Sequence, residues 1–119
     1  MGVILTTVIV LALAKTFKEE IVDLVRLIIH GVVTLLSYVV DYFKGLKLRK
    51  GRDIPFIADE TKLNIAERIH NAPVKNVHIF EATYNEDTEE IENYRSIAAD
   101  EMDSQLKDVL GNEPLVVLN

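Results

Sequence analysis

The sequence predicts an α+β protein in which one long apolar, membrane-spanning helix precedes a small acidic α-β-β-α-β domain. Residues 1–43 are mostly apolar and contain no proline. The segment 44–52 then holds five basic residues and no acidic one. Residues 1–52 hold eight Lys or Arg and four Asp or Glu, whereas residues 53–119 hold five and fifteen. This asymmetry predicts a membrane segment, 1–52, and a separate soluble domain, 53–119.

A single helix is the simplest interpretation of residues 1–43, because the segment has no proline and only Gly2 and Gly31 as weak helix breakers. Its uncharged runs, 1–14 and 27–40, are each shorter than the roughly 20 residues that span a bilayer. The second run reaches that length, from residue 24 to residue 43, if Arg26 snorkels at one end and Asp41 lies near the other interface.

The polar residues of this segment form one stripe when they are placed on a helix at about 100° per residue. Most of the remaining surface between residues 21 and 43 is apolar. A narrow polar stripe on an apolar helix favours lipid outside and a helix-helix interface, or the lining of a pore, inside. The stripe consists of Lys15, Glu19, Asp23, Arg26, His30, Thr34, Ser37 and Asp41.

The basic segment that follows predicts the orientation of the chain in a membrane. Basic residues beside an apolar span mark its cytoplasmic side and attract anionic lipid headgroups. We therefore expect a cytoplasmic acidic domain, or one inside a membrane-enclosed particle. The residues expected to contact headgroups are Lys44, Lys47, Arg49, Lys50 and Arg52.

Three other interpretations of the apolar segment stay open. A helix buried at the centre of a soluble bundle would also be apolar nearly all round. Two short spans could turn at 15-KTFKEE-20, although that turn lacks Gly, Pro or Asn. A cleaved signal peptide would explain 12-ALA-14, but its basic start is missing.

In the acidic half, composition and periodicity predict the order α-β-β-α-β after a linker at 51-GRDIP-55. Acids at its start and helical spacing indicate the first helix, and period-two alternation with β-branched residues indicates a hairpin. Gly111 stands where a helix C-cap is expected. The three strands should form one sheet with the helices on one face. The expected elements are helix 59–70, strand 74–84, turn 85–90, strand 91–98, helix 100–110 and strand 114–119.

The sequence contains no pattern typical of a catalytic or cofactor site. It has no cysteine, and His30, His70 and His78 accompany no nucleophile motif. Phosphate-binding and dinucleotide glycine motifs are missing, and the acidic turn lacks the spacing and glycine of a calcium loop. We therefore expect no enzyme activity, cofactor, metal or small-molecule substrate. Nucleic acid is not expected either, because the acidic half would repel phosphates.

These observations predict a small non-enzymatic membrane protein that oligomerises or packs into a larger assembly. Its partners would be the bilayer and either copies of itself or other membrane subunits, with the acidic domain as a docking module. The alternative is a pore-forming or ion-conducting subunit whose polar stripe lines the path, with His30 and Asp41 titrating. An enzyme or sensor with a membrane tether is the third class considered.

Overall fold

The computed structural model describes residues 2–19, 25–33, 36–63 and 76–118. The described strands form one five-stranded sheet in the order β1-β4-β3-β2-β5. Strands β2 to β5 pair antiparallel with their neighbours, whereas β1 runs parallel to β4 at one edge. The elements are α1 (Gly2–Glu19), β1 (Val25–Val33), α2 (Leu36–Gly45), β2 (Asp53–Asp59), β3 (Val77–Asn85), β4 (Glu90–Met102), α3 (Ser104–Leu110) and β5 (Leu115–Val117).

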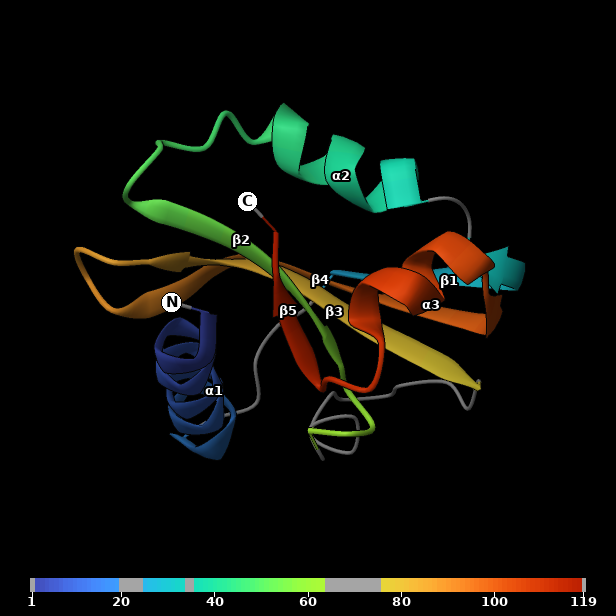
Figure 1. The fold of residues 1–119 in the computed structure, drawn as a ribbon, viewed down its shortest axis with the longest axis horizontal. Coiled ribbons are helices and arrows are strands. Elements are labelled where there is room, and N and C mark those ends of the chain that lie inside the picture. The colour runs from blue at the N-terminus through green and yellow to red at the C-terminus, as the bar shows by residue number, and fades with distance from the viewer. Residues whose placement is uncertain (1, 20–24, 34–35, 64–75, 119) are drawn as a thin grey trace.

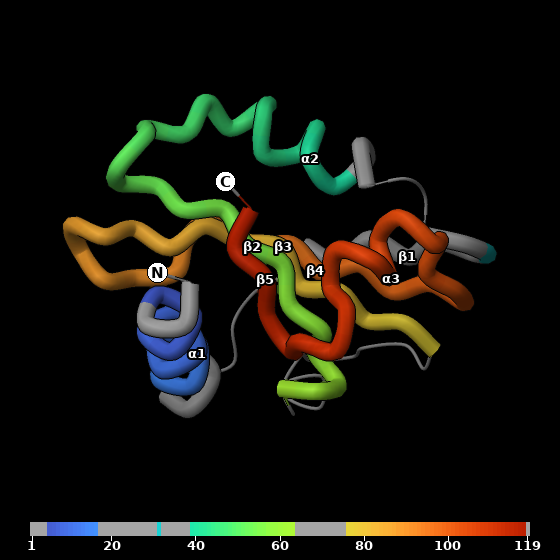
Figure 2. Tube along the Cα trace, viewed as in Figure 1, coloured from blue at the N-terminus to red at the C-terminus, as the bar shows by residue number. Residues whose placement is uncertain are grey.

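The sheet separates two hydrophobic clusters, because successive side chains of a strand point to opposite faces. On β2, Phe56 belongs to one cluster and Ile57 to the other, and both are fully buried. Helix α1 covers the first cluster with Ile9 and Leu13. Helices α2 and α3 cover the second, so α1 and α2 lie on opposite sides of the sheet (Figures 1 and 2).

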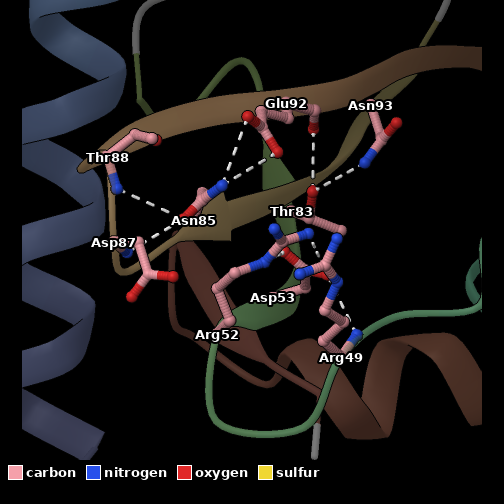
Figure 3. A network of polar contacts seen from close by, with 9 residues as sticks. All are labelled: Arg49, Arg52, Asp53, Thr83, Asn85, Asp87, Thr88, Glu92 and Asn93. Atoms are coloured by element: carbon pink, nitrogen blue, oxygen red, sulfur yellow. Dashed lines mark hydrogen bonds and ion pairs between the residues drawn. The ribbon is translucent and has the colours of Figure 1, made fainter.

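The β3-β4 hairpin confirms the predicted strands and the acidic turn between them. The Asn85 side chain closes the turn, since its Oδ1 accepts hydrogen bonds from the backbone N–H groups of Asp87 and Thr88 at 2.9 and 3.2 Å (Figure 3). Its Nδ2 donates to the Glu92 carboxylate at 3.4 Å. Local turn chemistry therefore sets this part of the fold.

The prediction of one long transmembrane helix in residues 1–43 is wrong. The segment forms α1, β1 and α2, and within the described part of the chain no helix is both long and apolar enough to cross a membrane. An apolar run without proline fits a buried strand as well as a buried helix, and periodicity alone does not separate them. Here apolar residues of the segment pack against the sheet, since Leu13 of α1 and Val39 of α2 lie in the clusters on its two faces.

Strand β1 is the element that breaks the expected helix. It pairs with β4 from Val25↔Arg95 to Val33↔Met102, so residues from both sides of Arg52 share one sheet. The register shifts between Ile29 and Val32, and Gly31 lies there with φ 112°, a left-handed conformation that favours glycine. Its backbone N–H donates to Oδ2 of Asp100 at 3.0 Å.

Several predictions for the acidic half also need correction. The expected linker 51–55 runs into β2, which begins at Asp53. The helix predicted from residue 100 begins only at Ser104, because β4 continues to Met102 and Asp103 caps α3 by accepting from the N–H of Leu106. The C-cap at Gly111 is confirmed.

The remaining two predictions concern the ends of the acidic half. The final strand is β5, which pairs antiparallel with β2. Of the helix predicted at 59–70, residue 59 ends β2 and residues 60–63 form turns, while residues 64–70 lie outside the described residues. The sheet has five strands instead of three, and the helices cover both faces instead of one.

Candidate functional site

Helix α2 forms one wall of the candidate site. Val39 and Phe43, four residues apart, share one helix face and are buried against the sheet. The helix ends at Gly45, and Leu46 and Lys47 donate their N–H groups back to the carbonyls of Phe43 and Lys44. Lys47 has φ 52°, which turns the chain back towards β2.

The loop between α2 and β2 is held by Asp53. Its Oδ2 accepts from the N–H of Arg49 at 2.9 Å, and the Arg52 guanidinium binds both carboxylate oxygens at 2.9 Å (Figure 3). The Arg52 hydrogen bond and the Arg49 N–H lower the pKa of Asp53. The carbonyl of Arg52 also accepts from the N–H of Glu86 in the hairpin turn, so the loop is tied to β3 and β4.

A groove of about 660 Å³ lies between α2, the start of β2, strand β5 and α3. Figure 1 shows the C-terminal end of the chain approaching α2 from the sheet. Leu118 donates its N–H to the carbonyl of Pro55 at 2.8 Å, which fixes this side of the groove. Eight of the ten lining residues are apolar and two are basic: Val40, Phe43, Lys44, Lys47, Leu48, Pro55, Val109, Val116, Val117 and Leu118.

The charge of the groove is opposite to that of the whole chain. The protein carries a net charge of -6, yet Lys44 and Lys47 are the only charged side chains among the described residues that line the groove. Both lysines are exposed, and Arg49 and Lys50 are exposed on the loop that follows. The groove therefore combines apolar walls with a local positive potential.

A buried ion pair lies beneath the same helix. Arg95 binds Glu81 through both carboxylate oxygens, and the Glu81 side chain has no exposed surface. The guanidinium carbon of Arg95 lies 3.9 Å from the centre of the Tyr42 ring. The Tyr42 hydroxyl donates to the carbonyl of Asn93 at 2.9 Å. Burial raises the pKa of Glu81 to about 7, against the opposing effect of Arg95. These contacts hold α2 in place as a wall of the groove.

A second buried polar pair joins the turn after β2 to strand β4. Ser96 donates its hydroxyl hydrogen to Oε2 of Glu60, and both residues are fully buried. A serine beside a carboxylate has the composition of a nucleophile and a base. A fully buried pair of this kind has the geometry of a structural contact.

Few features of the sequence indicate these buried polar groups. Glu81 lies inside 77-VHIFEATYN-85, a β-rich segment, and a carboxylate there was a possible signal because a buried charge needs a partner. Arg95, its partner, is separated from it by 14 positions. Period-two alternation places both on strands but does not pair them.

The structure divides the predicted polar stripe among three elements. Lys15 and Glu19 belong to α1, Arg26 and His30 to β1, and Ser37 and Asp41 to α2, while residues 23 and 34 lie outside the described residues. No common helix face unites them, because β1 interrupts the helix. Their roles at an oligomer interface or in a pore stay predictions.

The structure places the five predicted headgroup residues around the groove and its loop. Lys44 and Lys47 line the groove, Arg49 and Lys50 extend into solvent, and Arg52 is paired with Asp53. Their contact with lipid headgroups stays a prediction. In the described ranges, no group of three or more His, Asp or Glu side chains is placed to hold a metal ion.

Comparison of the chain with known protein families, with curated proteins and with solved structures gave no match. The function therefore has to be argued from the shape, charge and chemistry of the groove.

Proposed function

We propose that this protein is a non-enzymatic binding module that takes an apolar partner into the groove between α2 and β5. The observation that carries the proposal is the lining itself, in which eight apolar residues surround about 660 Å³. Ligand pockets commonly measure about 300 to 1,000 Å³ and combine apolar walls with a few polar groups. A ligand that fills the groove would remove this apolar surface from water. Burial of apolar surface stabilises a complex by roughly 25 cal/mol per Å².

The walls of the groove are held before any ligand arrives. Tyr42 anchors α2 to β4, Asp53 fixes the following loop, and Leu118 is bonded to Pro55. A preformed site loses less conformational entropy on binding than a site that must first be ordered. This arrangement supports binding without a large rearrangement of the backbone.

The proposal keeps the expectation of a docking module but changes where the partner binds. The expected module was the acidic domain 53–119 alone. The groove instead needs Val40 to Leu48 from the first half of the chain together with Pro55 and residues 109–118. The surface that would bind the partner is therefore built from both halves of the chain, 1–52 and 53–119.

The experiment uses Nile red, a neutral apolar dye, and two matched substitutions. Val116→Trp fills the groove, whereas Val8→Trp places the same side chain on an exposed position of α1, on the other face of the sheet. We expect dye fluorescence to report binding and NMR shift changes to cluster at groove residues. Val116→Trp should weaken binding at least about tenfold, or about 1.4 kcal/mol, and Val8→Trp should leave it unchanged.

Two results would overturn the proposal. One is the absence of dye-induced shifts at the groove residues. The other is equal dye affinity in Val116→Trp and Val8→Trp when both variants have folded NMR spectra.

A further inference from the structure

We infer that the ligand of the groove is a long-chain carboxylate of the fatty-acid type, with its chain on the apolar walls and its carboxylate at Lys44 and Lys47. This inference rests on the proposed function and specifies the ligand class. It follows from the distribution of polar groups: both charged lining residues lie where α2 ends, and the other eight are apolar. Such a site suits a ligand with one anionic end and an otherwise apolar body.

The turn after α2 brings the two lysines together. The N–H of Lys47 donates to the carbonyl of Lys44 at 3.4 Å, so the two residues bracket a single tight turn. Two lysines at the same end of an apolar groove attract an anion and disfavour a cation. Among the described residues, the lining contains no acidic side chain that would neutralise them.

Other ligand classes fit this lining less well. A sugar or nucleotide would place many polar atoms against a mostly apolar lining, and each buried polar atom without a hydrogen bond costs free energy. A neutral apolar molecule would leave the lysines without a countercharge. A single-chain carboxylate fits both parts of the site, because its chain contacts the apolar walls and its carboxylate pairs with the lysines.

An acidic, apolar peptide is the nearest competitor, because a peptide can also bring a carboxylate. Its backbone N–H and C=O groups need partners, however, and the adjacent sheet edge is β5. That strand has three residues and follows Pro114, which has no N–H to donate. Short edges of this kind are poor templates for strand addition. A hydrocarbon chain has no backbone N–H or C=O groups and needs no hydrogen-bond partners.

The experiment compares dodecanoate, 1-dodecanol and an acidic apolar peptide as ligands of the full chain, below the concentrations at which the amphiphiles aggregate. We expect dodecanoate to bind at least about tenfold more tightly than dodecanol in calorimetry or NMR titration. The double substitution Lys44→Gln/Lys47→Gln should remove that difference, and Lys44→Arg/Lys47→Arg should retain it because the charge remains.

The matched control is Lys62→Gln/Lys107→Gln, which removes the same charge from two exposed lysines outside the groove. This control should preserve the preference for dodecanoate. Nile red should bind the wild type and both glutamine variants alike, because the apolar walls are unchanged.

The possible failures are distinguishable. Equal affinity for dodecanoate and dodecanol, with Nile red still bound, overturns the carboxylate assignment and leaves the groove as a binding site. Binding of the peptide in place of dodecanoate also overturns it. If Nile red, dodecanol and dodecanoate all fail to bind, the proposed function itself fails.

Discussion

Arg95 on β4 binds both carboxylate oxygens of Glu81 on β3, with its Nη2 2.9 Å from Oε1 and 2.7 Å from Oε2. The pair lies under Tyr42 of α2, so a buried charge pair connects the centre of the sheet to a wall of the groove. Removing two charges from water is costly, and the pair is maintained only by close geometry and by further contacts to each group. The stability of the packing of α2 on the sheet therefore depends on the protonation state of Glu81.

The first prediction concerns the pH dependence of stability. Burial raises the pKa of Glu81 from 4.5 to about 7, so the folded protein keeps a proton that the unfolded chain releases between these values. The contribution of Glu81 to the free energy of unfolding should therefore fall as the pH rises from 4.5 to 7 and level off above 7. The slope is at most about 1.4 kcal/mol per pH unit for one proton.

Urea unfolding of the wild type and of Glu81→Gln across pH 5 to 8 measures this contribution by difference. The substitution should remove this component of the slope. The exposed Glu113→Gln serves as the control and should follow the wild type. A slope unchanged in Glu81→Gln would contradict the assignment.

The second prediction separates the partners of the ion pair. Arg95→Met leaves Glu81 buried without its cation, which should cost about 3 to 5 kcal/mol at pH 8. At pH 5 the cost should be smaller, because Glu81 can then take up a proton and become neutral. Adding Glu81→Leu should recover most of the loss at pH 8, since two apolar side chains then replace the pair. Denaturant unfolding at the two pH values tests all three variants.

The third prediction concerns the anchor of α2. Tyr42→Phe keeps the ring over Arg95 and loses the hydrogen bond to Asn93, which should cost about 0.5 to 1 kcal/mol. Tyr42→Ala also loses the ring contacts and should cost more. If α2 forms the groove wall as proposed, Nile red affinity should fall in Tyr42→Ala and change little in Tyr42→Phe. Equal effects of the two substitutions on affinity would argue against this role.

The fourth prediction tests the position of α1. Leu13 is buried in the core, whereas Leu11 of the same helix is 65% exposed. Leu13→Ala should destabilise the protein by about 2 to 5 kcal/mol, and Leu11→Ala should change stability by no more than about 0.5 kcal/mol. A helix that does not pack on the sheet would make the two substitutions equally mild in thermal or chemical unfolding.

The groove shows how far the sequence could indicate the candidate site. The basic composition of 44–52 singled out Lys44 and Lys47, but an adjacent apolar segment suggested lipid headgroups as their partners. The apolar walls opposite them come from Val109 and Val116, more than 60 positions along the chain. No local pattern relates these segments, because their proximity depends on how α2 and α3 pack on the sheet.

The sequence by itself determined the elements whose causes are local. The β3-β4 hairpin follows from strand alternation and from the Asn85 turn, and the end of α3 follows from Gly111. Only the tertiary structure decided that residues 25–33 form a strand, since β1 depends on pairing with β4 and on the contact between Gly31 and Asp100, 69 positions apart. The physical reason is that an apolar segment gains similar free energy by burial as a helix or as a strand, so the available partner surface selects between them.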